Sequence, residues 1–152
     1  MRNRIRRSNI PLKDTLVVKK SKIHDQGVYA KRDIAEGEHI IRYLGKRLTS
    51  KQANVKTCDD TYHYQISKRY TIDGKNDARY INHSCDPSCE SDVIRGVIWI
   101  IAIRKIKAGE ELTYNYGFNA KESQDYPCRC AARNCIGYIA DDVYWDKIKR
   151  MK

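Results

Sequence analysis

Short β-type stretches separated by turns dominate this sequence and limit what it can fold into. Seven stretches are rich in alternating or β-branched residues and are bounded by Gly, Asp, Asn or charged residues: 15–19, 27–31, 39–44, 62–67, 70–73, 97–103 and 111–116. Such spacing is typical of strands joined by short turns. Helical periodicity is poor except in 51–58 and in 141–152, the second with an apolar face formed by Val143, Tyr144, Ile148 and Met151. We therefore predict one mainly β domain that ends in a short helix.

Two segments repeat the same residue pattern 72 positions apart. Arg, Ile, Gly, Glu and Gly stand at positions 32, 34, 37, 38 and 45, and again at 104, 106, 109, 110 and 117. Two separate hairpins and an internal repeat both explain this pattern, and we interpret it as two hairpins.

The net charge of +11 is concentrated at the two ends of the chain. Residues 1–22 hold eight of the 30 basic residues and one acidic residue, and residues 143–152 hold four basic residues and one acidic residue. Between them 18 basic and 17 acidic residues nearly cancel. We interpret the ends as docking elements for an acidic partner such as DNA or a nucleosome, with a solubilising arm as the alternative.

Membrane insertion and secretion are not expected from the sequence. The longest apolar run, residues 96–103, is far shorter than the roughly 20 residues that span a bilayer. The Arg-rich start has no apolar stretch behind it, as a signal peptide would. Six cysteines in such a chain indicate a reducing compartment and thiolate ligands rather than disulfides.

Zinc is the metal that the cysteine spacing favours. Cys128, Cys130 and Cys135 lie within eight residues, so one loop can present three thiols. A tetrahedral zinc ion needs a fourth ligand from elsewhere. From the residues alone the candidates are Cys58, Cys85, Cys89 and the four histidines.

Two further motifs carry unusual polar chemistry. Residues 82–85 place an amide, an imidazole, a hydroxyl and a thiol side by side, a combination that is costly to bury unless each group has a partner. Tyr114 and Tyr116 are two residues apart, so their side chains lie on one face of a strand. Core packing is the usual explanation of such a pair, and an aromatic-walled channel is the alternative.

These motifs together resemble SET-domain protein lysine methyltransferases with a post-SET zinc loop, of the small stand-alone bacterial or trithorax type. The resemblance rests on 82–87, on 109–116 and on the cysteines that precede Gly137, with support from 21–30 and 41–45. It implies a mainly β SET fold of small sheets with a pseudoknot, in which 111–116 passes beside 82–85, followed by a C-terminal post-SET zinc loop and a short terminal helix. It divides the chain into a basic N-terminal arm (1–15), a SET domain (16–120), a post-SET zinc-binding segment (121–139) and a C-terminal helix (140–152).

The resemblance also implies an activity, namely methyl transfer from S-adenosylmethionine to a lysine of a protein or peptide, histone-like or other, with mainly mono- and dimethylation. An intracellular location follows, in the cytoplasm or at chromatin. The cofactor contacts that it implies are His24, Gln26, Gly27, Asn82 and His83, with Tyr116 at the point of methyl transfer. The implied walls of the lysine channel are Tyr43, Tyr62 and Tyr114, backed by Tyr64 or Phe118. The implied ligands of one structural zinc ion are Cys85, Cys128, Cys130 and Cys135, whereas Cys58 and Cys89 do not match.

Three positions depart from the family pattern. Asp25 stands where glycine is usual, Arg42 where an acidic residue is common, and Ser88 where asparagine is common. Two other functions fit parts of the sequence: a zinc-containing nucleic-acid-binding module, with basic ends on phosphates and tyrosines as stacking platforms, and an inactive SET-type reader.

Overall fold

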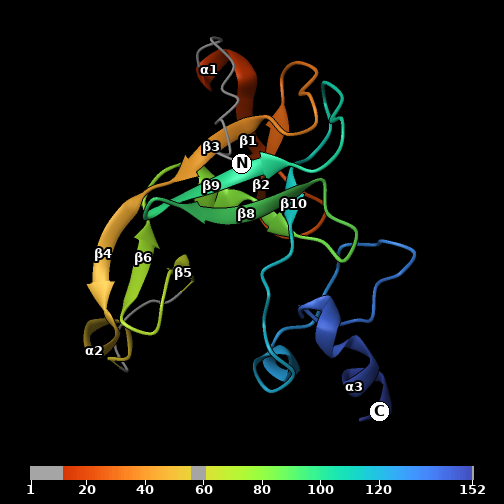
Figure 1. Ribbon diagram of the computed structural model, residues 1–152. Helices are drawn as coiled ribbons and strands as arrows, with labels where there is room; N and C mark the ends of the chain where they lie inside the picture. Colours follow the sequence, from red (N-terminus) through yellow and green to blue (C-terminus); the bar gives the residue numbers. More distant parts are fainter. Residues whose placement is uncertain (1–11, 56–60, 152) are drawn as a thin grey trace.

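The computed structural model describes residues 12–55 and 61–151 and is mainly β, as predicted (Figure 1). The strands are β1 (Leu16–Lys20), β2 (Gln26–Ala30), β3 (His39–Tyr43), β4 (Gly45–Thr49), β5 (His63–Gln65), β6 (Tyr70–Gly74), β7 (Asn82–His83), β8 (Cys89–Ile94), β9 (Val97–Ala102) and β10 (Thr113–Tyr114). The α-helices are α1 (Leu12–Thr15), α2 (Ser50–Ala53) and α3 (Trp145–Arg150). Short 3₁₀ turns occupy η1 (Asp77–Tyr80), η2 (Glu122–Asp125) and η3 (Asp142–Tyr144).

Three small sheets make up the β structure. β1 and β2 form an antiparallel pair, β4, β6 and β5 form a three-stranded sheet in that order, and five strands form a sheet in the order β3-β9-β8-β10-β7. β10 runs parallel to both β7 and β8, between which it lies. A late segment of the chain is thus inserted between two earlier ones, which confirms the predicted pseudoknot.

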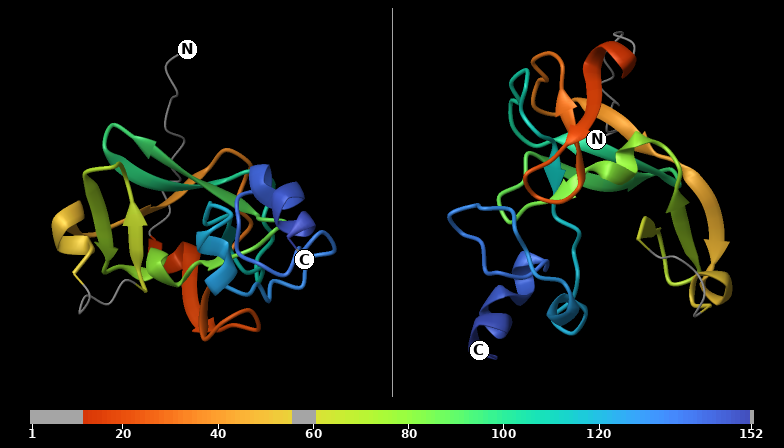
Figure 2. Two further views of the ribbon diagram at one scale, coloured as in Figure 1. Left: turned by 90° about the horizontal axis from the view of Figure 1, so that it is seen from below. Right: turned by 180° about the vertical axis from the view of Figure 1, so that it is seen from behind.

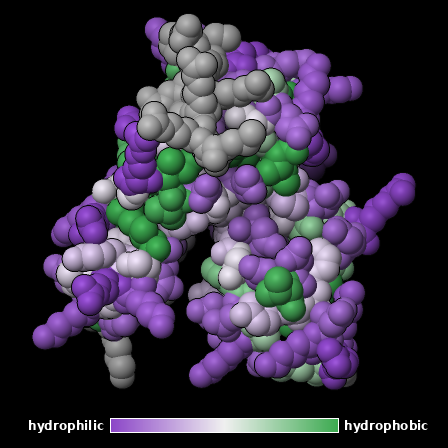
Figure 3. All heavy atoms as spheres, in the orientation of Figure 1, coloured by the Kyte–Doolittle hydropathy of each residue, from purple (hydrophilic) through white to green (hydrophobic). Residues whose placement is uncertain are grey.

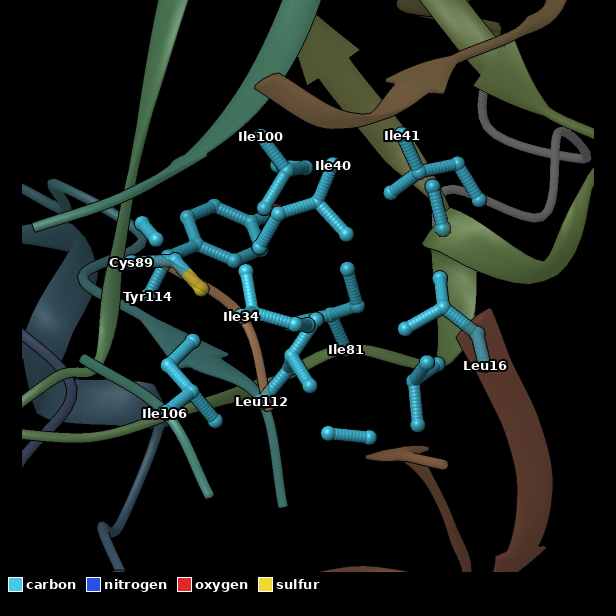
Figure 4. Close-up of a cluster of buried hydrophobic side chains, with 14 of the residues drawn as sticks. Leu16, Ile34, Ile40, Ile41, Ile81, Cys89, Ile100, Ile106, Leu112 and Tyr114 are labelled. Atoms are coloured by element: carbon cyan, nitrogen blue, oxygen red, sulfur yellow. The ribbon is translucent and has the colours of Figure 1, made fainter. Parts of the chain in front are cut away.

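The core follows from the apolar run in β9. Five consecutive residues of this strand, 98–102, are buried, as expected of a strand covered on both faces. Figure 4 shows isoleucine and leucine side chains from several elements packed in one cluster, with Tyr114 and Cys89 at one side of it. The sequence pattern did not predict β4, β7 and β8, because β8 carries mostly exposed polar residues and β7 is only two residues long.

The two segments with the repeated pattern pair with each other, so the hairpin interpretation was wrong. Ile34 and Ile106 exchange backbone hydrogen bonds of 2.8 and 3.0 Å. The amide of Gly37 donates to the carbonyl of Ala102, and the amide of Gly109 donates to the carbonyl of Ala30. The second contact is the first with the two segments exchanged, because Gly109 corresponds to Gly37 and Ala30 to Ala102. The pattern therefore marks an internal repeat with local two-fold symmetry.

The C-terminal segment has a small core of its own. Ala120, Ile136, Ala140 and Ile148 are buried together, with Tyr138 and Trp145 packed against them. The predicted terminal helix is present, but its apolar face was wrong: Ile148 is buried, whereas Val143 is 75% and Met151 55% exposed. The reason is that α3 begins only at Trp145, after a 3₁₀ turn that changes the phase of the preceding residues.

Helix α2 is shorter than the helix predicted over 51–58. It covers Ser50–Ala53 and starts with a capping box, in which Thr49 and Gln52 satisfy each other's backbone amides. Residues 56–58 lie outside the described part of the chain.

The surface is hollowed on one side. Figure 3 shows a gap between the lobe formed by β4, β5, β6 and α2 and the lobe formed by the C-terminal segment. Both views in Figure 2 keep these two lobes apart, below the five-stranded sheet in the view from behind. No helix in the described residues is long and apolar enough to cross a membrane.

Candidate functional site

The pseudoknot brings the polar motif and the tyrosine motif side by side. Thr113 pairs with Asn82 and Tyr114 with His83, so the two motifs lie on neighbouring parallel strands although 31 positions separate them. Ser88 stabilises the place where the chain around Thr113 passes beside residues 82–88, because its buried hydroxyl accepts a hydrogen bond of 3.1 Å from the amide of Thr113. We call this place the crossing. The amide of Ser88 donates to the Thr113 hydroxyl at 3.3 Å. The serine at this departure from the family pattern thus makes two bonds across the crossing.

Asn82 connects this strand to the loop that precedes β2. Its side-chain Nδ2 donates to the carbonyl oxygens of Gln26 at 2.8 Å and of His24 at 3.3 Å. The same Nδ2 donates to Glu111 Oε1 at 2.9 Å. The side chains of His24 and Gln26 lie on the exposed side of this loop. The described residues donate no hydrogen bond to the amide oxygen of Asn82, which leaves an acceptor beside the loop.

Glu111 is a central residue of the site that sequence reasoning did not single out. Its carboxylate accepts bonds from Ser21 Oγ at 2.8 Å, from Tyr29 Oη at 2.9 Å and from Asn82 Nδ2. It also lies against Gly27, where an added Cβ would be 2.3 Å from Glu111 Oε1. The available signal was the pair of acidic residues before a buried strand. Glu110 forms a surface ion pair with Arg104, whereas Glu111 points inward and holds the loop.

Asp25 adopts a backbone conformation that explains its departure from the family pattern. Its φ is +37°, in the left-handed region that favours glycine but tolerates aspartate. The loop therefore keeps the turn that glycine would allow, at some cost in backbone strain.

His83 positions Tyr116. Its Nδ1 accepts a hydrogen bond of 3.1 Å from the backbone amide of Tyr116, and the two rings meet edge to face at 5.4 Å. Burial lowers the pKa of His83 to about 4, so the imidazole is neutral and can accept this bond at neutral pH.

Four tyrosine rings are packed together beside these residues, and we call Tyr43, Tyr64, Tyr114 and Tyr116 the tyrosine group. The rings of Tyr114 and Tyr116 are 5.0 Å apart and those of Tyr43 and Tyr64 are 5.5 Å apart. Burial raises the pKa of all four phenols, that of Tyr114 well above its usual range. All four hydroxyls are therefore protonated at neutral pH.

Three of the four hydroxyls have a fixed acceptor. Tyr116 Oη donates to the carbonyl of Ile81 at 2.9 Å, Tyr64 Oη to Ser91 Oγ at 2.7 Å and Tyr43 Oη to the carbonyl of Tyr62 at 2.7 Å. The hydroxyl of Tyr114 makes no hydrogen bond with any described residue.

The other two predicted aromatic residues lie at the margin of the tyrosine group. Tyr62 contributes its carbonyl, while its ring packs edge to face on Tyr80 and under the guanidinium of Arg79. Phe118 extends the aromatic contacts outward, because it packs on Tyr116 at 5.9 Å and on Tyr126 at 4.9 Å. Arg42 is exposed on β3, on the strand face opposite the buried Tyr43.

Four cysteines form a cluster at the end of the pseudoknot, and we call Cys85, Cys128, Cys130 and Cys135 the cysteine cluster. Their sulfur atoms all lie within 4.8 Å of one another, and Cys85 Sγ is 3.9 Å from Cys128 Sγ. Four sulfurs at about 2.3 Å from a tetrahedral zinc ion would be about 3.8 Å apart, so the arrangement fits this metal.

The remaining described cysteine and the histidines are not members of this cluster, although His83 Nε2 lies 3.7 Å from Cys85 Sγ. Cys89 is buried in the main core, and burial raises the pKa of its thiol to about 11. Cys58 lies outside the described residues. Within the cluster, burial raises the pKa of the Cys85 thiol to about 12 and also raises that of Cys128. For Cys130, hydrogen bonds from two backbone amides and two neighbouring thiols outweigh burial and lower the pKa to about 7. A thiol that loses its proton this readily is suited to bind a metal.

Comparison with known proteins identifies the fold. Residues 25–117 match the SET domain family, and the chain therefore belongs to that family. It is 35% identical over 143 residues to a histone-lysine N-methyltransferase of Saccharomyces cerevisiae described as H3 lysine-4 specific, which covers 84% of this chain and 13% of that protein.

Two other relatives come from distant eukaryotes. The chain is 36% identical over 140 residues to the histone-lysine N-methyltransferase trithorax of Drosophila melanogaster, covering 84% of this chain and 4% of that protein. It is 40% identical over 141 residues to the variant-silencing SET domain-containing protein of Plasmodium falciparum, covering 81% of this chain and 6% of that protein. The chain thus spans only a small part of the length of these relatives.

Proposed function

We propose that this protein is an S-adenosylmethionine-dependent protein lysine N-methyltransferase. The observation that carries the proposal is the tyrosine group, which has two buried and two partly buried rings and contacts the network of Asn82, His83 and Glu111 through Tyr116. Relatives that share more than a third of the residues over most of this chain are named histone-lysine N-methyltransferases.

The cofactor would bind at the loop before β2. His24, Gln26 and Gly27 would contact its amino acid end through backbone groups, and the free amide oxygen of Asn82 is an acceptor suited to an ammonium group. His83 would contact the adenine side. When bound, S-adenosylmethionine supplies an electrophilic methyl group on a sulfonium.

The tyrosine group would prepare the lysine for attack. A lysine amine has a pKa of about 10.4 in water and is protonated at neutral pH. A dry aromatic channel beside a positive charge disfavours the ammonium, by desolvation and by repulsion between like charges. The lysine therefore loses its proton before transfer, and the remaining task of the protein is to hold the amine in line with the methyl group.

Each tyrosine would have a separate part in this channel. Tyr116, held by His83 and by the carbonyl of Ile81, would stand at the point of transfer. Tyr43, Tyr62 and Tyr114 would form the walls. With its free hydroxyl, Tyr114 can hold the amine or a water molecule, which leaves less room for a nitrogen that already carries methyl groups. We therefore expect mainly monomethyl-lysine and some dimethyl-lysine.

Zinc would be structural in this protein. Four thiolates complete a tetrahedral site and leave no open position for substrate. The ion would join Cys85, which follows the Asn82–His83 strand, to the C-terminal segment. The chain is expected to be divided as the sequence indicates, with the SET domain up to residue 120 and the zinc-binding segment from 121 to 139.

Substrate and location follow from the same proposal. We expect a lysine in a histone-like or other basic protein and an intracellular site, at chromatin in a eukaryotic cell. The described parts of the two basic ends, α1 with β1 and the basic α3, lie at opposite ends of the molecule, so docking on DNA through both would need two contacts (Figures 1 and 2). The basic residues Arg2, Arg4, Arg6 and Arg7 lie outside the described residues.

A transfer assay tests the proposal. Purified protein would be incubated with S-adenosylmethionine carrying a labelled methyl group and with a panel of basic proteins, including histones. We expect label on lysine in at least one protein, located by mass spectrometry. A complete lack of transfer to the panel by zinc-loaded protein would contradict it.

A further inference from the structure

Gly74, the last residue of β6, lies directly under the ring of Tyr43. A Cβ added at Gly74 would be 2.6 Å from Tyr43 Oη and 2.8 Å from both Cε1 and Cζ of that ring. These separations are too short for any side chain to fit without moving the tyrosine. The absence of a side chain at residue 74 therefore determines where the Tyr43 hydroxyl lies.

The position of Tyr43 against Gly74 gives its hydroxyl a backbone acceptor. Tyr43 Oη donates to the carbonyl of Tyr62 at 2.7 Å, and the amide of Gly74 donates to the same carbonyl at 3.0 Å. One carbonyl thus accepts from both residues. A carbonyl oxygen has two lone pairs, so this acceptor is fully used.

The hydrogen bond from Tyr43 to the Tyr62 carbonyl determines which tyrosine hydroxyls in the channel are available to a substrate amine. Tyr64 is bonded to Ser91 and Tyr116 to the carbonyl of Ile81, so among the tyrosine group only Tyr114 keeps a hydroxyl without a described partner. The ring of Tyr43 contacts that of Tyr64, and all four rings belong to the same hydrophobic cluster, so a displaced Tyr43 remains among the tyrosine group.

We propose that Gly74 is a positioning residue for product specificity: it lets Tyr43 bond to the Tyr62 carbonyl and so leaves Tyr114 as the one hydroxyl of the tyrosine group that has no described partner and can meet the substrate amine. This inference rests on the proposed lysine methyltransferase activity. A side chain at residue 74 pushes the Tyr43 ring away from β6 and toward the other rings of the tyrosine group. The channel then becomes narrower and gains a second free hydroxyl, and both changes oppose a second methylation.

A double-mutant cycle tests this positioning. The variants are Gly74→Ala, Tyr43→Phe and the double variant, each measured for Tm and for the ratio of dimethyl- to monomethyl-lysine on a peptide taken to completion. Tyr43→Phe alone should lower Tm by about 2–4 °C through loss of one buried hydrogen bond. It should leave the product ratio unchanged within about twofold, since that hydroxyl does not face the amine.

Gly74→Ala should lower the dimethyl share by at least about threefold. When Tyr43→Phe is added to Gly74→Ala, it should lower Tm by no more than about 1 °C further, because the hydrogen bond to the Tyr62 carbonyl is already lost. It should also restore part of the dimethyl share. A matched control is Gly96→Ala, at an exposed turn with a φ of +76° and nothing within 4 Å of an added Cβ. This change strains the backbone and should leave the product ratio unaltered.

Each result decides between clear alternatives. Additive losses of Tm in the cycle, with an unchanged product ratio in Gly74→Ala, would overturn the inference while leaving the activity intact. If Gly74→Ala does not fold, Tyr43→Phe alone decides: a rise in dimethylation as large as that of Tyr114→Phe would mean that Tyr43 meets the amine itself. Lack of methyl transfer by the unmodified protein would overturn the proposed function, and with it the role in product choice, whereas the Tm cycle would still report where the Tyr43 hydroxyl lies.

Discussion

The tyrosine group and the cysteine cluster are neighbours that are held in place by different means. Three of the four tyrosines lie on strands, and three hydroxyls bond to fixed acceptors of the same fold. Three of the four cysteines lie in the part of the C-terminal segment between η2 and η3, outside any helix or strand, and are half-buried, and their sulfurs contact mainly each other. The fold itself therefore organises the tyrosines, whereas we expect the proposed zinc ion to hold the cysteines together.

Removal of the metal is expected to have the largest effect and to separate the two regions. The protein should hold about one zinc per chain. Cys135→Ser or chelation should release it and reduce methyl transfer by more than about 100-fold, because the C-terminal segment beside the site loses its anchor. Elemental analysis and the transfer assay measure both. Cys89→Ser is the matched control, since Cys89 is outside the cluster, and should keep the zinc. Full zinc in Cys135→Ser would contradict the ligand assignment.

The two tryptophans report on the two regions separately. Trp145 belongs to the small C-terminal core, whereas Trp99 lies in β9. With Trp99→Phe, chelation should shift the fluorescence of Trp145, and with Trp145→Phe the emission of Trp99 should stay the same. An equal response of both would mean that the metal holds the whole fold.

Glu111→Gln is expected to weaken the cofactor loop without disturbing the cysteine cluster. The charge that holds Ser21, Tyr29 and Asn82 is lost, at a cost of about 1–3 kcal/mol. Binding of S-adenosylhomocysteine, measured by calorimetry, should weaken by about 10- to 100-fold. Glu110→Gln, which breaks only a surface ion pair with Arg104, should cost at most about 1 kcal/mol. Equal effects of the two changes would remove the special role of Glu111.

Tyr114→Phe should change the product and leave stability nearly unchanged. Its hydroxyl has no described partner, so its removal breaks no hydrogen bond of the fold and frees space in the channel. Mass spectrometry should detect a shift of a few-fold toward higher methylation. If Tyr114 only packs, the rate or the stability changes but the product ratio does not, and trimethylation as the main product of the unmodified protein would also contradict this role.

Asp25→Gly should have the smallest effect. Glycine relieves the positive φ of this residue but adds freedom to the unfolded chain, and the two contributions nearly cancel. We expect the free energy of unfolding to change by less than about 1 kcal/mol. Cofactor binding should stay within about threefold. A change of more than tenfold would show that the aspartate side chain itself contacts the cofactor.

The same two regions show how far a sequence can be interpreted. The spacing of Cys128, Cys130 and Cys135 predicts a metal loop, but the residues alone left the fourth ligand open, and only the resemblance favoured Cys85. The structure places Cys85 with the other three because the pseudoknot ends there. Local spacing could not supply this, since the contact depends on strands far apart in the chain.

Other features also depend on contacts between segments that are far apart in the sequence. The mainly β class and the terminal helix followed from local patterns. The pairing of Ile34 with Ile106 did not, because each segment on its own is equally compatible with a hairpin. The inward turn of Glu111 and the contact of Tyr43 with Gly74 become visible only when distant strands are brought together.

The most direct test compares the unmodified protein with Tyr116→Phe in the transfer assay. The substitution keeps the ring beside His83 and deletes the hydroxyl at the point of transfer, so we expect turnover to fall by about 100-fold or more. The melting temperature should fall by only the few degrees that correspond to one lost hydrogen bond. Near-normal turnover in Tyr116→Phe, with an unchanged melting curve, would contradict the assignment of this tyrosine to the methyl-transfer step.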